Sequence, residues 1–180
     1  MRTYMWVRIW TFLVSIISLV AGTYCHFKNY GLWSNILIGI FSSSLLTYIG
    51  ALISYKITRK ESLLSYLGAL QRYRCKFRNY ERHCKMPDLS IDTIEGDFQS
   101  LREYRYDMHY NVYLKLQHIS KKHRMPRNLN RAFILIKNVQ EQLDNNNGKL
   151  SDKMEYDINE AIEIVEREAI KIKAIKPKNK

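Results

Sequence analysis

The stretch that decides the fold runs from Leu32 to Cys84 and reads LWSNILIGIFSSSLLTYIGALISYKITRKESLLSYLGALQRYRCKFRNYERHC. Its first part, residues 32–55, contains no Asp, Glu, Lys, Arg or His. At ~1.5 Å of rise per residue, a helix of this length spans the ~30 Å hydrocarbon core of a bilayer. No proline separates it from the basic, tyrosine-rich part that follows. The stretch therefore predicts a transmembrane helix that continues directly into a second helical segment.

A regular spacing runs through both parts of this stretch. The positions recur at steps of four or three, and from Leu63 onward each is apolar or aromatic. They are Leu45, Ile49, Leu52, Lys56, Arg59, Leu63, Tyr66, Leu70, Tyr73, Phe77, Tyr80 and Cys84. This is the spacing of a heptad seam, which favours a helical stalk or coiled coil. An amphipathic helix that packs in an ordinary core would show the same pattern.

The N-terminal segment is a second apolar stretch, residues 9–25, and Arg2 and Arg8 precede it. Aromatic residues typical of membrane interfaces flank the stretch, namely Trp6, Trp10 and Tyr24. We interpret it as a first transmembrane helix. A cleaved signal peptide is the alternative, because the basic start and the small residues 21–23 are compatible with one.

The connection between the two apolar stretches sets the expected topology. Residues 26–31 carry one basic group, Lys28, whereas several lysines and arginines lie near the other ends of the two stretches. The positive-inside rule then places both termini in the cytoplasm and the connection outside. The sequence therefore predicts a transmembrane hairpin with both termini on the cytoplasmic side.

Small and hydroxyl residues gather on one face of the second predicted span. They are Gly39, Ser43, Thr47, Gly50 and Ser54, and Ser15, Ser18 and Gly22 form a similar set in the first span. Such faces allow helices to pack closely, which predicts homo-oligomers. In an oligomer, the hydroxyl groups could instead line a water-filled path. The spans contain no charged residue, which argues against a proton-coupled pump or transporter.

The rest of the chain predicts an all-α cytosolic part. The expected organisation is residues 1–31 as first span and periplasmic loop, 32–55 as second span, 56–86 as basic stalk helix, 87–176 as helical domain and 177–180 as basic tail. Asp92 is expected to begin a helix near residue 93, because Glu95 follows it as in a capping box. Ser151 is expected to cap the last helix, and residues 145–148 to close the one before it.

Charge is unevenly distributed along a chain whose net charge is +12. Residues 56–85 and 121–131 are strongly basic. Because the first basic block directly follows a predicted span, topology and attraction to anionic lipid explain it more simply than nucleic-acid binding. The three cysteines, Cys25, Cys75 and Cys84, have no metal-binding spacing and are expected to be free thiols in a reducing compartment.

The basic block at residues 121–131 is the predicted ligand site. Its cationic residues are Lys121, Lys122, Arg124, Arg127 and Arg131. The last two share a face at the start of a predicted helix, where free amide groups and the helix dipole attract anions. The block therefore predicts a site for an anionic nucleotide or a nucleic-acid-containing activator. A solvated basic loop is the alternative.

Motifs for catalysis or metal binding are not found. The sequence has no glycine-rich phosphate loop, no HExxH, no paired CxxC and no nucleophile elbow. His118 and His123 would form a metal site with Cys75 and Cys84 only if the fold brought the four together. We therefore expect a protein that is not an enzyme, with no catalytic residue, metal or cofactor.

In layout, two N-terminal spans followed by a small helical cytosolic domain, the chain resembles bacterial anti-phage membrane effectors. Examples are the two-span effectors of retron systems and the membrane proteins of type III CRISPR systems that bind cyclic oligoadenylate. The resemblance implies that the cytosolic domain senses a signal, or a partner protein encoded nearby, and that the oligomer then permeabilises or depolarises the membrane.

A non-catalytic membrane anchor or scaffold is the alternative function. It would hold a nucleic-acid or protein partner through the basic residues of 72–85 and 121–131. A small holin or toxin is disfavoured, because such proteins need no soluble domain of this size.

Overall fold

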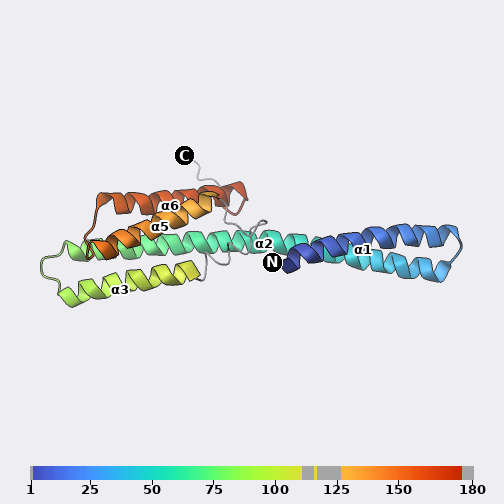
Figure 1. The fold of residues 1–180 in the computed structure, drawn as a ribbon, viewed down its shortest axis with the longest axis horizontal. Coiled ribbons are helices and arrows are strands. Elements are labelled where there is room, and N and C mark those ends of the chain that lie inside the picture. The colour runs from blue at the N-terminus through green and yellow to red at the C-terminus, as the bar shows by residue number, and fades with distance from the viewer. Residues whose placement is uncertain (1, 111–115, 117–126, 176–180) are drawn as a thin grey trace. The chain divides into compact units, whose positions relative to one another are not determined.

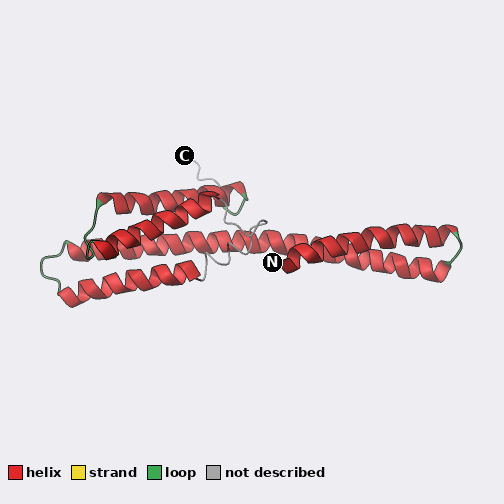
Figure 2. Cartoon of the chain, in the orientation of Figure 1, coloured by secondary structure: helices red, strands yellow, loops and turns green. Residues whose placement is uncertain are grey.

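The structure is a computed structural model that describes residues 2–110, 116 and 127–175. Five helices are defined in it: α1 (Arg2–Phe27), α2 (Gly31–Cys84), α3 (Ile91–Met108), α5 (Arg127–Asn145) and α6 (Asp152–Lys171). Figure 2 shows that helices and short connections make up these residues, which include no strand. The predicted all-α class is confirmed.

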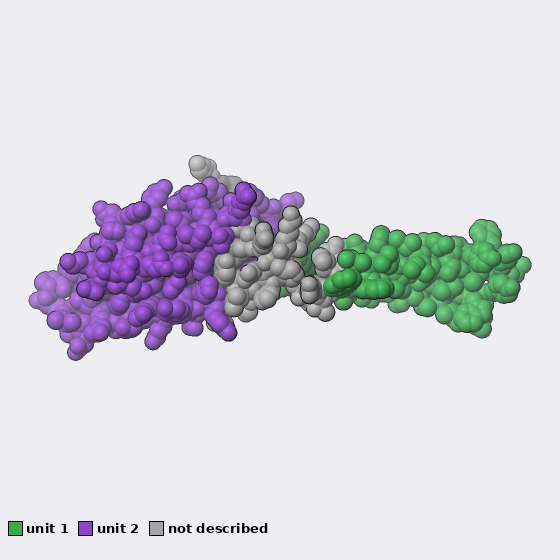
Figure 3. Space-filling view, in the orientation of Figure 1, with its two compact units in different colours: residues 1–58 green, residues 59–180 purple. Residues whose placement is uncertain are grey.

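Helix α2 is the longest element, with 54 residues, and it contributes to two compact units. The first unit is Met1–Thr58 and the second is Arg59–Lys180, as coloured in Figure 3. The boundary therefore falls within α2, shortly after the predicted end of the apolar run at Tyr55. The predicted continuation of the apolar helix into the basic, tyrosine-rich segment is confirmed.

The first unit is an antiparallel hairpin of α1 and residues 31–58 of α2 (Figure 1). The connection between the helices is short, and Asn29 adopts a left-handed conformation with φ 63°. The backbone N–H of Tyr30 donates to the carbonyl oxygen of Cys25 at 2.9 Å, which closes the turn.

The polarity of the hairpin is the reverse of that of a soluble core. Among its described side chains, the most buried are the serines Ser15, Ser18 and Ser34, which are at most 5 % exposed. Large apolar side chains are exposed over most of its length, with Leu46 76 % and Ile17 65 % exposed. Both helices are long and apolar enough to cross a membrane.

The second unit packs four helical segments around an apolar core. They are residues 59–84 of α2 together with α3, α5 and α6, and Figure 1 shows α3 along one side of α2 and α6 along the other. The predicted seam supplies the α2 side of this core. Its buried members, at most 4 % exposed, are Leu63, Tyr66, Leu70, Tyr73, Phe77 and Tyr80.

The other three helices cover this seam with apolar side chains. The buried partners include Leu101 and Met108 of α3, Ile136, Val139 and Leu143 of α5, and Met154, Ile158 and Val165 of α6. Burial of each large apolar side chain stabilises the fold by about 1.5–3 kcal/mol. From Leu63 to Tyr80 the seam therefore packs within its own chain. The seam positions Leu45, Ile49 and Cys84 are instead exposed.

A chain of hydrogen bonds joins α2 to α5, and it runs from the buried Tyr73 and Gln140 out to Asp144 at the surface. The Tyr73 hydroxyl donates to Gln140 Oε1 at 3.4 Å, and Gln140 Nε2 donates to Asp144 Oδ1 at 3.1 Å. The pKa of Tyr73 is raised, mainly by burial. The positive charge of Arg105 lowers this pKa, and the negative charge of Asp144 raises it. The phenol therefore stays protonated and keeps its donor role. Because a buried donor without a partner is costly, this chain favours one register of α5 on α2.

The ends of the helices differ from the sequence-based expectation at one point. Helix α3 is capped by Ser90, whose hydroxyl accepts a hydrogen bond from the Thr93 N–H at 3.4 Å. The predicted cap at Asp92 is wrong, because Asp92 already lies in the first turn of the helix. Ser151 does occupy the N-cap position of α6, although its side chain makes no capping hydrogen bond.

Gly148 closes the turn after α5 in a left-handed conformation with φ 78°. Its N–H donates to Leu143 O at 2.8 Å, and its carbonyl accepts from the Tyr80 hydroxyl at 2.8 Å. A Cβ at this position would overlap the Tyr80 hydroxyl. The turn that joins α5 to α6 therefore depends on glycine for both its backbone conformation and its contact with α2.

We expect Gly148→Ala to lower the free energy of unfolding by about 1–3 kcal/mol, since it combines backbone strain with loss of space. Chemical denaturation of the full chain, followed by circular dichroism, measures the change. Gly96→Ala is the matched control, because a Cβ there meets nothing within 4 Å and lies in a helix. It should stabilise by about 0.5–1 kcal/mol. Equal effects of the two substitutions would show that the turn does not depend on glycine at residue 148.

Candidate functional site

The small-residue face predicted on α2 is exposed along its whole length. Gly39, Ser43, Thr47, Gly50 and Ser54 are all exposed in the first unit. A Cβ added at Gly39 or Gly50 would meet nothing within 4 Å. The face is therefore not used within the hairpin.

Two hydroxyl groups of this face, those of Ser43 and Thr47, donate within their own helix. The Ser43 hydroxyl donates to Gly39 O at 3.0 Å, and the Thr47 hydroxyl donates to Ser43 O at 2.8 Å. Such back-bonding leaves no hydroxyl donor that requires water or a partner. The side chains of this face are therefore small, and the face is compatible with an apolar environment or with a second helix.

The hairpin itself is held together by another face of α2. Ser15 Oγ lies 2.9 Å from Ser44 Oγ, and the Phe12 and Tyr48 rings are 5.8 Å apart at their centroids. The Ser34 hydroxyl donates to the carbonyl of Gly22 at 3.3 Å.

At Gly22 the backbone of α1 lies close to α2. A Cβ there would lie 3.3 Å from Leu37 Cβ, which is tighter than ordinary packing. The α1 residues in this contact belong to the small-residue set predicted for the first span, but the α2 residues do not. The missed signal is the spacing of Ser34, Leu37, Phe41, Ser44 and Tyr48, at steps of three and four. At 100° per residue, this contact face lies roughly 130° around the helix from the exposed small-residue face.

The predicted basic ligand site is described only in part. Lys121, Lys122 and Arg124 lie outside the described residues. Arg127 is exposed at the first residue of α5, and Arg131 one turn later donates to Glu160 Oε1 of α6 at 2.5 Å. An anion at Arg131 would have to compete with this carboxylate. The phosphate site at residues 121–131 stays a prediction.

A small hollow of about 150 Å³ separates α5 from α6 beside this ion pair. Charges of both signs line it, since Arg131 and Lys171 face the carboxylates of Glu160 and Glu168. Glu168 accepts hydrogen bonds from Asn128 at 2.9 Å and from Lys171 at 2.7 Å. Burial raises the pKa of Glu168, but these hydrogen bonds and the positive charges of Lys171 and Arg59 outweigh it and lower the pKa. In the hollow, Arg131 is therefore paired with Glu160 and Lys171 with Glu168.

Two arginines of α2 in the second unit also have partners on α6. Arg78 donates to Glu155 of α6 through Nε at 3.0 Å and Nη2 at 2.8 Å, and Arg74 Nη1 donates to Asn159 Oδ1 at 3.4 Å. These two arginines fasten α2 to α6. Part of the basic surface considered for nucleic-acid binding at residues 72–85 is thus used for packing between helices.

Groups able to do redox or metal chemistry are sparse in the part of the chain that the structure describes. No group of three or more His, Cys, Asp or Glu residues suited to a metal ion occurs there, and His118 and His123 lie outside it. Cys25, Cys75 and Cys84 are free thiols. His83 Nδ1 and Asp97 Oδ2 form a close ion pair between α2 and α3. This pair joins two helices, and the described residues place no third ligand beside it.

Comparisons with known proteins found no match for this chain. The chain matches no family model, no curated protein and no solved structure. The function must therefore be argued from the residues themselves.

The hairpin contact predicts a specific cross-link. In a chain whose three native cysteines are replaced by serine, Ser15→Cys with Ser44→Cys should form an intramolecular disulfide on mild oxidation. The reason is that the two hydroxyl oxygens are 2.9 Å apart and a disulfide needs close side chains. Ser15→Cys with Ser43→Cys is the control, because the Ser43 side chain is exposed on the other face. Intact-mass measurement detects the bond, and preferential cross-linking of the control pair would refute the assigned faces.

Glu168→Gln should destabilise the second unit at neutral pH. A carboxyl whose pKa is lowered in the fold stabilises the fold above the ordinary glutamate pKa of 4.5, and this contribution is lost as pH falls through the lowered value. Chemical denaturation across this pH range should show the difference from wild type shrinking on acidification. Glu163→Gln is the control, because the Glu163 side chain is 69 % exposed and should contribute little. A difference that grows on acidification would contradict the assigned hydrogen bonds.

Proposed function

We propose that the chain is a bacterial inner-membrane effector. In this proposal the hairpin of α1 and residues 31–58 spans the bilayer and self-associates, and the second unit receives a signal or partner that leads to membrane permeabilisation. The observation that carries the proposal is the reversed polarity of the hairpin, in which serines are buried and large apolar side chains are exposed.

This reversed polarity is costly in water and favourable in lipid. Monomeric soluble proteins rarely expose contiguous apolar patches larger than a few hundred Å². Each large apolar side chain moved out of water gains about 1.5–3 kcal/mol. A helical hairpin also satisfies its backbone hydrogen bonds internally, as a membrane-spanning segment must. The hairpin therefore suits a bilayer much better than a solvated surface.

Aromatic and basic residues support one orientation. Trp10 near the start of α1 is 60 % exposed, and Trp33 near the start of α2 is 61 % exposed, so each end of the hairpin carries an aromatic residue suited to a membrane interface. The connection has one basic residue, Lys28, while Lys56, Arg59 and Lys60 follow the apolar part of α2. We place the termini and the second unit in the cytoplasm on this charge asymmetry.

The exposed small-residue face supports self-association. In lipid, helices associate where small residues let their backbones approach and increase van der Waals contact. Within the hairpin, Gly22 already plays this part. Gly39 and Gly50 offer two more such positions on a face with open space beside it. A second hairpin that packs there would bring the hydroxyls of Ser43 and Thr47 to the centre of an oligomer.

The biological setting and the activator are further parts of the proposal. Because the layout resembles that of anti-phage effectors, we extend the proposal to a role in anti-phage defence. An anionic nucleotide or nucleic-acid activator would bind at residues 121–131, beside Arg127. A protein encoded nearby could supply the signal instead. The second unit would then act as the sensor and the hairpin as the output.

Adjacent serines provide a matched test of the output. We expect expression of the wild-type chain in bacteria to depolarise the inner membrane, and Ser43→Leu or Gly50→Leu to abolish this by filling the small-residue face. Ser42→Leu is the control, because Ser42 is also exposed but lies on another side of α2. A membrane-potential dye measures the effect at equal protein amounts in the membrane fraction.

Two outcomes would count against this proposal. Equal depolarisation by the Ser43→Leu and Ser42→Leu variants would remove the face from the mechanism. Membrane localisation without depolarisation at any expression level, with or without the neighbouring genes, would favour the anchor or scaffold function.

A further inference from the structure

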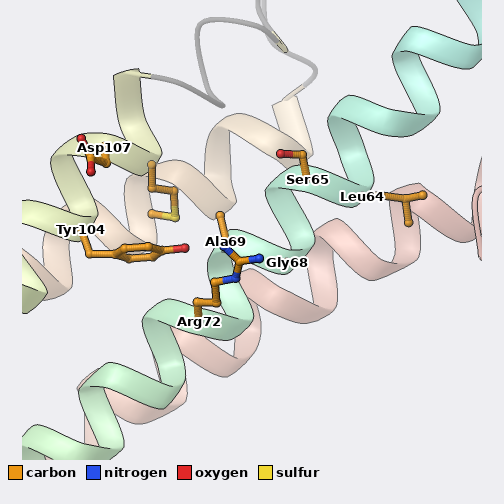
Figure 4. A pocket seen from close by; sticks show the side chains of 8 residues that line it. Leu64, Ser65, Gly68, Ala69, Arg72, Tyr104 and Asp107 are labelled. Carbon is orange, nitrogen blue, oxygen red and sulfur yellow. The ribbon is translucent and has the colours of Figure 1, made fainter.

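A cavity of about 350 Å³ lies between α2 and α3 within the second unit. It falls in the range of small-molecule sites, roughly 300–1,000 Å³. Its floor is apolar and includes Ala69 and Met108, both buried in the core. Its walls carry the polar side chains of Ser65, Arg72, Tyr104 and Asp107. Figure 4 shows Arg72 and the Tyr104 hydroxyl pointing toward one another across the space between the helices.

Arg72 differs from Arg74, Arg78 and Arg131, which hold partners on another helix. Arg74 and Arg78 donate to partners on α6, and Arg131 donates to Glu160. Within the described part of the chain, Arg72 is in none of the ion pairs, and its charge lowers the pKa of the Tyr104 phenol that it faces across the cavity. A guanidinium has five N–H donors in a planar fork. Arg72 therefore keeps donors that can bind an anionic group in the cavity.

Tyr104 lies between charges of opposite sign. Burial raises the pKa of Tyr104, the charge and hydrogen bond of Arg72 lower it, and the charge of Asp107 raises it further. Arg72 and Asp107 thus both act on the same phenol, yet among the described ion pairs they are not joined to each other. Among the described residues, neither charge on the cavity wall is neutralised by an ion pair.

We propose that this cavity binds a small zwitterion. Its phosphate or carboxylate group binds Arg72 and the hydroxyls of Ser65 and Tyr104, and its ammonium group binds Asp107. The proposal goes beyond the effector function, because the cavity belongs to the second unit alone and does not depend on membrane insertion.

The charges and the shape of the cavity both favour this ligand class. Ser65 and Arg72 of α2 and Tyr104 of α3 offer three donors, which suit phosphate or carboxylate oxygens that accept several charge-assisted hydrogen bonds. A purely anionic ligand would be repelled by Asp107 and a purely cationic one by Arg72. Gly68 lines the same cavity, and a Cβ there would meet nothing within 4 Å. The missing side chain at residue 68 therefore leaves room for the ligand.

Isothermal titration of the purified full chain in maltoside micelles tests the proposal. The probes are phosphoethanolamine and β-alanine, and the reference ligands are inorganic phosphate, ethanolamine and propionate. We expect at least one zwitterion to bind with saturation and more tightly than its singly charged references. Arg72→Gln and Asp107→Asn should each weaken this binding by about tenfold, the loss expected for one charge-assisted hydrogen bond. Arg82→Gln, an exposed arginine of the same helix outside the cavity, should not change it.

A cavity-filling variant guards against unfolding as an explanation. Gly68→Leu adds a side chain in open space and replaces glycine in a helix, so the chain should stay folded and yet lose zwitterion binding. Circular dichroism checks the fold. Zwitterions that bind no better than their singly charged references, or equal binding by wild type, Gly68→Leu and Arg72→Gln, would overturn the proposal.

The zwitterion could be a free metabolite or a lipid headgroup, and reconstitution separates the two. Nanodiscs of phosphatidylglycerol with phosphatidylethanolamine should block phosphoethanolamine binding relative to phosphatidylglycerol alone, whose headgroup has no cation, if the lipid headgroup occupies the cavity. Equal binding in both nanodiscs assigns the cavity to a free zwitterion.

Discussion

One helix, α2, takes part in two packing environments of opposite polarity, and this constraint governs the rest of the molecule. In residues 31–58 the buried contacts involve hydroxyl groups and a glycine of α1, and the apolar side chains are exposed. In residues 59–84 the same helix buries three tyrosines, a phenylalanine and several leucines. The two parts of α2 therefore suit different surroundings, and one apolar core of a soluble domain could not cover both.

The sequence predicts best the part of the fold in which buried apolar residues recur at a regular spacing. The seam from Leu63 to Tyr80 is visible because burial recurs with each turn of the helix. The same periodicity failed in residues 45–52, because the hairpin buries small and hydroxyl residues rather than leucines. The cap of α3 was misplaced because Ser90 and Asp92 are both good N-cap residues, and their order in the chain does not decide between them.

The candidate sites were less accessible to sequence, because they depend on contacts between distant residues. Arg131 and Glu160 are on different helices, so the neutralisation of this arginine follows from the packing of α5 on α6. Arg72 and Tyr104 likewise meet only when α3 folds back along α2. A basic stretch in a sequence therefore overstates the number of cations available to a ligand. The structure separates arginines that join helices, such as Arg78, from one that faces a cavity, Arg72.

The serine contact of the hairpin has a consequence for how the two helices can separate. Ser44 Oγ lies near Ser15, and it also donates to its own backbone at Ile40 O, 2.8 Å away. If α1 moves off, Ser44 loses one partner and retains its own backbone partner, whereas Ser15 loses its two described partners on α2, Phe41 O and Ser44 Oγ. In double-mutant cycles, hydrogen bonds between transmembrane helices contribute only about 0.6 kcal/mol on average. The contact between α1 and α2 can thus break and re-form, whereas a buried charge pair at the same place would hold the two helices together.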